Sequence, residues 1–218
     1  MNIQLALDRF EIERAIAIAR LAAPYVQWIE VGTSMIKQFG MDSVRAVRRA
    51  FPDHVVVADM KTFDNAAYEF GMCFDAGADA ATVMGAAPPI TVEACMNVGA
   101  RRGKRVMIDL LQTTEEEQVL LTAYRDAVFC LHISKDEQEL AAGGGTLACA
   151  GERSPLLRLK RQGLQTAVAG GITLDAMPGL TALRPDVVIV GSSITLADDP
   201  AGAARRFKNQ SIYGRNEG

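Results

Sequence analysis

Eight short runs of β-branched and aliphatic residues recur along this 218-residue chain, and segments with helical periodicity separate them. This alternation is typical of repeated βα units around a parallel sheet. We expect strands at Ile3–Leu7, Gln27–Val31, Val55–Ala58, Ala80–Met84, Val106–Leu110, Val128–Leu131, Thr166–Ala169 and Val187–Val190. We expect helices at Glu11–Ala22, Ser43–Ala50, Asn65–Ala76, Ile90–Arg102, Glu115–Arg125, Pro155–Gln162, Leu174–Leu183 and Pro200–Gln210.

The number of units favours a closed (β/α)₈ TIM barrel over an open doubly wound sheet, because eight strands spaced by roughly 25 residues fit a barrel better. A chain of this length that is 49% hydrophobic can bury one large core, so a single domain over residues 1–218 is expected. Residues 211–218 are expected to form a frayed tail.

Composition excludes several classes of partner. The formal net charge of −3 creates no field that would gather nucleic acid or an anionic membrane. No stretch reaches the roughly 18 apolar residues that span a bilayer. The four cysteines lack the paired spacing of a zinc site, and we expect buried thiols in a reducing compartment at Cys73, Cys95, Cys130 and Cys149. The sequence therefore predicts a soluble, cytoplasmic protein.

One segment breaks the regular spacing. Residues 134–154, between the sixth strand and its helix, include Gly143-Gly144-Gly145 and are too long for an ordinary connection. Two interpretations remain open for this segment, a mobile active-site loop or a simple surface insertion.

Polar residues occupy the ends of six predicted strands, where the chemistry of a TIM barrel takes place. They are Asp8, Glu30, Asp59 with Lys61, Thr82, Asp109 and His132. A single charged group at a strand end can be capped or solvated. Several charges that converge on one rim are costly to bury unless they pair or bind a metal. The carboxyl end of the barrel is therefore the candidate site.

The last two strands run into small residues, in Ala169-Gly170-Gly171 and Gly191-Ser192-Ser193. Small side chains leave backbone N–H groups open to a phosphate, and barrels commonly hold phosphate after these two strands. The alternative is a tight turn that needs a positive φ at glycine. Phosphate binding is the expected role of Gly170, Gly171, Gly191 and Ser192.

The run from Asp59 to Asp64 is the densest polar cluster. The period of two directs Asp59 and Lys61 to one side, and Asp64 lies at the start of the next helix, where it could also be the N-cap. Carboxylates beside an ammonium can serve metal binding and proton transfer. Because Glu30 and Asp59 offer oxygen ligands without a partnering histidine, Mg²⁺ is the expected metal.

Five segments carry a resemblance to a known family: Gln4-Leu5-Ala6-Leu7-Asp8, Ile29-Glu30-Val31-Gly32-Thr33, the DxKxxD run Asp59 to Asp64, Ala167-Val168-Ala169-Gly170-Gly171-Ile172 and Asp186-Val187-Val188-Ile189-Val190-Gly191. The sequence resembles the orotidine 5'-monophosphate decarboxylase suprafamily, in the branch that holds 3-hexulose-6-phosphate synthase and 3-keto-L-gulonate-6-phosphate decarboxylase.

The resemblance implies a homodimer with shared active sites, in which Glu30 and Asp59 hold Mg²⁺ and Lys61 stabilises a 1,2-enediolate. Asp64 would reach into the partner's site and His132 would shuttle protons. The remaining residues expected at the site are Asp109 as a catalytic group and Asp8, Thr82, Lys135 and the two glycine loops as ligands of a sugar phosphate.

The resemblance leaves two activities. The synthase adds formaldehyde to ribulose 5-phosphate, and the decarboxylase removes CO₂ from 3-keto-L-gulonate 6-phosphate. Asp109, Ala169 and Ser192 are closer to the synthase, whereas Lys135 is a cation where the decarboxylase has arginine. We expect synthase-type aldol chemistry, with the decarboxylase or another sugar phosphate as alternatives. A non-catalytic sugar-phosphate binding protein is the alternative outside enzymology.

Overall fold

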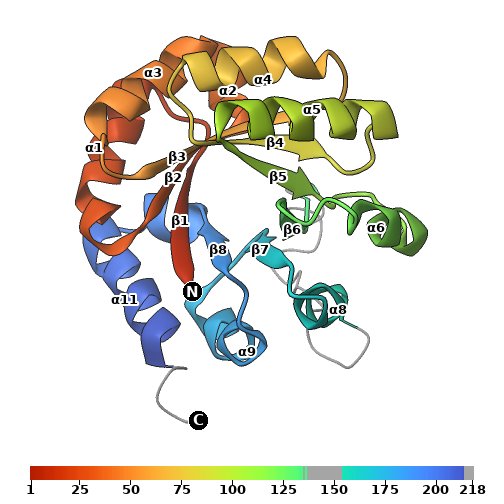
Figure 1. Cartoon of the computed structure of the whole chain (residues 1–218). Helices are drawn as coiled ribbons and strands as arrows, with labels where there is room; N and C mark the ends of the chain where they lie inside the picture. Colours follow the sequence, from red (N-terminus) through yellow and green to blue (C-terminus); the bar gives the residue numbers. More distant parts are fainter. Residues whose placement is uncertain (135, 137–153, 214–218) are drawn as a thin grey trace.

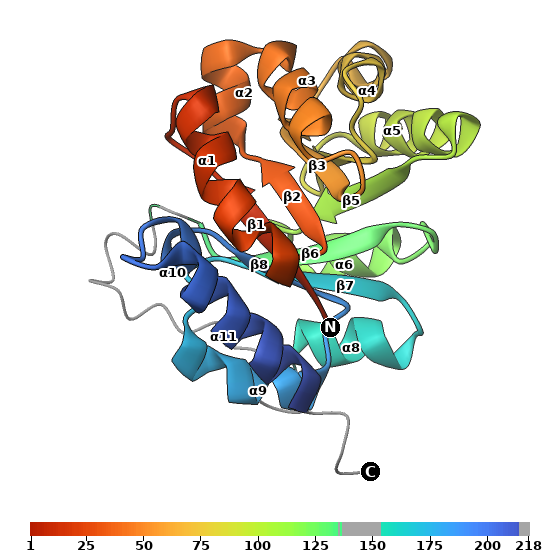
Figure 2. The ribbon, with the colours of Figure 1, turned by 90° about the vertical axis from the view of Figure 1, so that its left-hand side faces the viewer.

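Eight parallel strands form a closed barrel in the order β1 to β8, and helices surround it (Figures 1 and 2). The computed structural model describes residues 1–134, 136 and 154–213. The strands are β1 (Asn2–Leu7), β2 (Trp28–Val31), β3 (Val55–Thr62), β4 (Ala80–Met84), β5 (Arg105–Asp109), β6 (Val128–His132), β7 (Gln165–Ala169) and β8 (Val187–Val190). This architecture confirms the predicted (β/α)₈ TIM barrel.

A helix follows each strand as expected, and the structure also contains short helices and 3₁₀ turns that were not predicted. Their bounds are α1 (Ile12–Ala22), α2 (Thr33–Phe39), α3 (Met41–Ala50), α4 (Ala66–Asp75), α5 (Pro89–Arg102), α6 (Glu115–Leu121), α8 (Pro155–Arg161), α9 (Met177–Leu183), α10 (Ser192–Thr195) and α11 (Pro200–Tyr213), with 3₁₀ turns at Ala23–Tyr25 and Leu174–Ala176. The prediction from sequence missed α2 and α10. They have seven and four residues, and both are shorter than the roughly 11-residue window in which helical periodicity can be recognised.

Several predicted boundaries change, and helix α6 ends at Leu121 rather than at Arg125. Helix α11 continues to Tyr213, so residues 211–213 of the expected tail are helical, and residues 214–218 lie outside the described residues. Strand β3 continues past Ala58 to Thr62 through a register shift against β4. The irregular insertion 134–154 is described only at Ser134, Asp136 and Ser154, so neither interpretation of that loop is tested.

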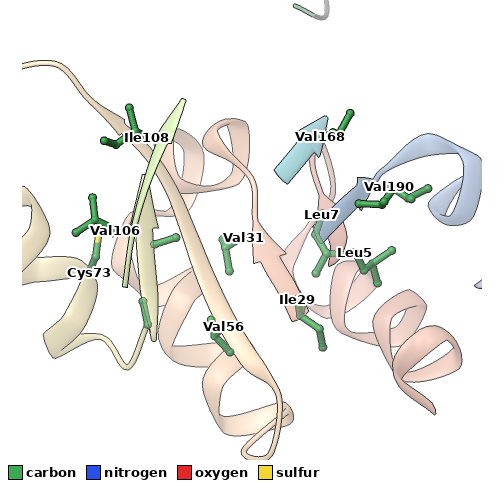
Figure 3. Close-up of a cluster of buried hydrophobic side chains, with 14 of the residues drawn as sticks. Leu5, Leu7, Ile29, Val31, Val56, Cys73, Val106, Ile108, Val168 and Val190 are labelled. Carbon is green, nitrogen blue, oxygen red and sulfur yellow. The ribbon is translucent and has the colours of Figure 1, made fainter. Parts of the chain in front are cut away.

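Alternate residues of each strand build two separate layers of the core. The outward residues pack against the helices, and Figure 3 shows part of this cluster, with Leu5 of β1 beside Val190 of β8 and Cys73 reaching in from α4. The inward residues form a second apolar cluster that includes Trp28 and Met107. This layer fills the barrel interior, as in other barrels of this size.

The same two-residue step places polar groups above the inner layer. Two positions beyond Trp28, Val57 and Met107 stand Glu30, Asp59 and Asp109, and two positions beyond Ala80 and Cys130 stand Thr82 and His132. Side chains separated by two positions on a strand share one face. The strands therefore carry their polar residues into the interior at the carboxyl end, on a floor of packed apolar side chains.

The described cysteines are buried thiols, as expected. Cys73, Cys95 and Cys130 are free, and burial raises the pKa of Cys73 and of Cys95 to about 12. Cys149 lies outside the described residues. Among the helices in the described part of the chain, none is long and apolar enough to cross a membrane.

Candidate functional site

A cavity of about 620 Å³ opens at the carboxyl ends of the strands, and all eight strands or the loops after them contribute to its lining. Eleven of the predicted site residues line it: Asp8, Glu30, Asp59, Lys61, Thr82, Asp109, His132, Gly170, Gly171, Gly191 and Ser192. The structure thus brings together the polar strand ends and both glycine loops. Of the other two, Asp64 is not among the lining residues and Lys135 lies outside the described residues.

Lys61 stands at the centre of the charged groups. Its Nζ lies 2.6 Å from Oδ2 of Asp109 and 3.2 Å from Oδ1 of Asp59. Burial by itself would lower the pKa of Lys61, but the charges of Asp59 and Asp109 outweigh it and raise that pKa well above its usual value. The ammonium is therefore a permanent positive charge in the cavity.

Asp109 links Lys61 to His132. Its Oδ2 lies 2.9 Å from Nδ1 of His132, and its Oδ1 accepts a 3.0 Å hydrogen bond from the backbone N–H of Leu111. Burial would raise the pKa of Asp109, but the hydrogen bond with His132 and the charge of Lys61 lower it. An ionised Asp109 fixes the imidazole orientation through Nδ1, so Nε2 is the nitrogen available for proton exchange with a ligand.

The hydroxyl of Thr82 holds the irregular part of β3. It donates to Oδ1 of Asp59 at 2.8 Å and accepts from the backbone N–H of Lys61 at 2.8 Å. Lys61 has a φ of 50°, a conformation that is uncommon for a residue other than glycine. Thr82 therefore positions both Asp59 and Lys61, in a way that the sequence pattern did not indicate.

Glu30 is buried beside other carboxylates. Burial raises its pKa well above the usual value, and the charges of Asp59 and Asp8 raise it further. Nε2 of Gln4, a fully buried side chain, donates to Oε2 of Glu30 at 2.5 Å. The site thus concentrates negative charge that a bound cation would relieve.

The carboxylates of Glu30 and Asp59 fit Mg²⁺, which is usually held by one or two carboxylates together with water and substrate oxygens. Within the described residues, no group of three or more histidine, cysteine, aspartate or glutamate side chains is arranged to hold a metal ion. With two carboxylates from the protein, the other ligands of such an ion would be water and substrate oxygens.

Asp8 is turned toward the beginning of α2. Its Oδ1 accepts a 2.6 Å hydrogen bond from Oγ of Ser34. A Cβ added to Gly32 would lie 2.2 Å from the same oxygen, so the glycine is needed for this close approach. Thr33, the first residue of α2, donates its hydroxyl to Oδ2 of Asp59 at 2.6 Å. The helix that the prediction from sequence missed thus supplies two polar contacts to the site.

The two glycine loops differ in whether φ and steric contacts require glycine. Gly170 and Gly171 have φ values of 103° and 62°, and a Cβ added to Gly170 would lie 2.5 Å from the carbonyl oxygen of Ile133. A tight turn therefore accounts for both glycines. Gly191 has a φ of −103°, and an added Cβ would meet nothing nearer than the carbonyl oxygen of Ala6 at 3.8 Å. Contacts of an added Cβ therefore do not account for the glycine of the second loop.

Asp64 lies apart from the cavity of its own chain. Helix α4 begins at Ala66 with Asn65 as its N-cap residue, so the expectation that Asp64 could be the N-cap is wrong. Oδ1 of Asp64 accepts a 2.7 Å hydrogen bond from the backbone N–H of Asn65, and the side chain is exposed.

Sequence reasoning missed four residues that contribute to the site: Gln4, Arg9, Thr33 and Ser34. Gln4 could have been found as the only polar residue in the predicted apolar run Ile3–Leu7. Thr33 and Ser34 follow the glycine that ends the β2 segment, which places them on the rim. Arg9 follows Asp8 directly, and only the fold makes it part of the cavity.

Comparison with known proteins connects this geometry to a family. A family described as "Orotidine 5'-phosphate decarboxylase / HUMPS family" matches residues 1–207. The 3-hexulose-6-phosphate synthase of Bacillus subtilis is 32% identical over 98% of this chain and 100% of its own length.

Two solved structures share the whole fold. The 3-hexulose-6-phosphate synthase of Salmonella typhimurium is 32% identical with a TM-score of 0.86, over 98% of this chain and 100% of that one. KGPDC of Streptococcus mutans, solved in complex with a sugar phosphate, is 28% identical with a TM-score of 0.87, over 97% of each chain. These findings confirm the resemblance seen in the sequence, and the chain belongs to the orotidine 5'-phosphate decarboxylase / HUMPS family.

Proposed function

We propose that this protein is a Mg²⁺-dependent carbon–carbon lyase that acts on a sugar phosphate through a 1,2-enediolate, most like 3-hexulose-6-phosphate synthase. The observation that carries the proposal is the hydrogen-bonded series Lys61, Asp109 and His132 beside the oxygen pair Glu30 and Asp59, all in one cavity. Its volume of about 620 Å³ is in the range of small-molecule sites.

In the proposed synthase reaction, a proton leaves C1 of ribulose 5-phosphate to give the 1,2-enediolate. C1 then attacks the carbon of formaldehyde, and the new alkoxide takes up a proton. His132, oriented by Asp109 through Nδ1, moves these protons at Nε2. The ammonium of Lys61 stabilises the developing oxyanion, because it is already fixed in position before charge develops.

Mg²⁺ held by Glu30 and Asp59 would supply further positive charge for the oxygens of the keto sugar. Thr33 and Thr82 keep Asp59 oriented toward the cavity, and Gln4 does the same for Glu30. Such supporting hydrogen bonds commonly tune metal sites.

The rest of the cavity suits the remainder of a sugar phosphate. Backbone N–H groups of the loops at Gly170-Gly171 and Gly191-Ser192 would bind the phosphate, and Asp8 would accept hydrogen bonds from the sugar hydroxyls. The sugar-phosphate complex of the Streptococcus mutans relative supports a ligand of this class.

The choice of synthase rests on Asp109, Ala169 and Ser192, all of which line the cavity. The test is incubation with Mg²⁺, ribulose 5-phosphate and formaldehyde, and separately with 3-keto-L-gulonate 6-phosphate. Loss of formaldehyde without CO₂ release in the second reaction supports the synthase. CO₂ release alone would establish the decarboxylase alternative, and binding of sugar phosphate without either reaction would favour a non-catalytic protein.

The proposal includes a homodimer in which Asp64 completes the partner's site. In support, Asp64 is exposed outside its own cavity and lies near two exposed aromatic residues, Phe63 at 54% and Tyr68 at 64%. A contiguous exposed apolar patch commonly marks an interface, and these two aromatic residues would contribute to one.

A mixing experiment tests the shared site. Lys61→Ala and Asp64→Asn are each expected to be inactive. When subunits exchange at random, half of the dimers carry both variants, and each of these has one intact site, so activity returns to about a quarter of the wild-type level. Continued inactivity of a mixture in which exchange has been demonstrated would remove Asp64 from the partner's site.

The cellular setting is also part of the proposal. The buried free thiols of Cys73, Cys95 and Cys130 suit a reducing compartment. We therefore place the enzyme in the cytoplasm. Fractionation of the source cells, with detection by a specific antibody, tests this placement.

A further inference from the structure

The charged side chains that line the cavity are mostly acidic. Within the described residues they comprise two cations, Lys61 and Arg9, and five carboxylates, Asp8, Glu30, Asp59, Asp109 and Asp136. The Nζ of Lys61 is bonded to Asp59 and Asp109. The electrostatic field of these carboxylates repels a phosphate dianion that enters the cavity. Phosphate binding therefore needs a positive charge close to the phosphate itself.

Arg9 lines the cavity from the loop after β1, a strand that pairs with both β2 and β8. It directly follows Asp8 in the loop after β1, and β1 pairs with β8, the strand that leads into Gly191. A Cβ added to Gly191 would lie 3.8 Å from the carbonyl oxygen of Ala6, so the end of β1 and this loop are in close contact. Lys61 belongs instead to β3, which is separated from β8 by β2 and β1.

The backbone at Arg9 is held in a defined, uncommon conformation. Its φ is 60°, and its N–H donates to Oγ of Ser34 at 2.9 Å. The same Oγ donates to Asp8 at 2.6 Å. A non-glycine residue with positive φ persists only where its surroundings fix it, and such residues are common at ligand sites. Ser34 therefore fixes both the carboxyl group of Asp8 and the backbone conformation at Arg9.

We propose that Arg9 binds the phosphate of the sugar phosphate, together with the backbone N–H groups of the Gly191-Ser192 loop. The guanidinium suits this role because its planar N–H groups match two phosphate oxygens at once. Arg9 is then a determinant of selectivity for phosphorylated over unphosphorylated sugars. This inference rests on the proposed function for the identity of the sugar, but not for the binding of phosphate.

The test compares Arg9→Gln with Arg14→Gln, which removes the same charge from an exposed position on the neighbouring α1. Arg9→Gly is a second variant, because glycine adopts a positive φ without strain and so separates loss of the side chain from misfolding. The first readout is thermal stabilisation by inorganic phosphate. The second is the KM for ribulose 5-phosphate in the presence of Mg²⁺ and formaldehyde.

Both Arg9 variants should need at least about tenfold more phosphate for the same stabilisation, the scale of one charge-assisted contact. The KM for ribulose 5-phosphate should rise by a similar factor while the KM for formaldehyde stays unchanged, and Arg14→Gln should behave as the wild type. Equal phosphate stabilisation in wild type and Arg9→Gly, or no stabilisation of the wild type, would overturn the inference. If the wild type lacks synthase activity, the proposed function fails while the phosphate titration still decides the role of Arg9.

Discussion

At the scale of single residues, two carboxyl oxygens each serve two donors. Oδ1 of Asp59 accepts from Lys61 and Thr82, and Oδ2 of Asp109 accepts from Lys61 and His132. Each contact to a carboxylate is charge-assisted and stronger than a neutral hydrogen bond. The position of the ammonium is therefore set from two sides, and its removal leaves two buried carboxylates without their counter-charge.

Lys61→Ala is expected to lower kcat by roughly a thousandfold or more while the protein stays folded, because it removes a preorganised charge from the developing oxyanion. Steady-state kinetics and circular dichroism measure the two effects. Lys37→Ala, at an exposed position on α2, serves as the control for loss of a lysine. Turnover near the wild-type rate in Lys61→Ala would refute the assigned role.

Glu30→Gln is expected to stabilise the metal-free protein and abolish activity. The neutral amide removes one of three neighbouring negative charges and can still accept the hydrogen bond from Gln4. The free energy of unfolding should rise, because burial and the charges of Asp59 and Asp8 raise the pKa of Glu30 and so penalise its charged form. Urea unfolding in the presence of a chelator measures this change. A less stable variant would show that Glu30 serves the fold rather than metal binding.

At the scale of elements, the strands were predictable because their short runs of β-branched and aliphatic residues recur at regular spacing. The polar residues at the ends of these runs also predicted which side chains would meet at the carboxyl end of the barrel. The continuation of β3 to Thr62 was not predictable, because it depends on the hydroxyl of Thr82, a residue 21 positions away from Lys61. Helix α2 was missed for a related reason, since its first polar residues are held by contacts to Asp8, just after β1, and to β3.

The two glycine loops should respond differently to alanine. Gly170→Ala combines a positive φ with a Cβ 2.5 Å from a backbone oxygen and should cost about 1–3 kcal/mol of stability. Gly191→Ala meets only ordinary contacts at 3.8 Å, but φ and ψ of −103° lie between the α and β regions, so it should cost about 1 kcal/mol or less. If its N–H binds phosphate, this variant should weaken the ligand instead. Thermal unfolding and phosphate titration of the pair separate the two effects, and a reversed order would contradict this account.

At the scale of the whole molecule, the two ends of the barrel carry different networks. The carboxyl end holds the cavity, and the amino end holds Asp79, just before β4, between Arg48 and Lys104. Burial would raise the pKa of Asp79, but the backbone N–H of Val56, the hydrogen bond from Lys104 and the charge of Arg48 lower it. The network joins three βα units at the end opposite the chemistry.

Asp79 should therefore stabilise the fold above its unfolded pKa of about 3.8, and this stabilisation should be lost as the pH falls through the lower folded pKa. Asp79→Asn is expected to lose about 1 kcal/mol at neutral pH. Its stability should also decline less steeply than that of the wild type below pH of about 4. Denaturation at a series of pH values from neutral to strongly acidic tests both points. Parallel stability curves for the two proteins would exclude the linkage, and kcat should not change.

The separation of inward and outward positions along each strand has a consequence for how such an enzyme can diversify. The last inward-facing residue of each strand comes from that strand alone. The apolar layer beneath it is built by residues of several neighbouring strands. Exchange of one such residue, or of one in the loop just beyond, alters one direction of the cavity and leaves the helix-facing layer untouched. Natural or laboratory evolution can therefore vary Ala169 and Ser192 one at a time while the scaffold is inherited unchanged, whereas a change at Asp109 also disturbs its contacts with Lys61 and His132.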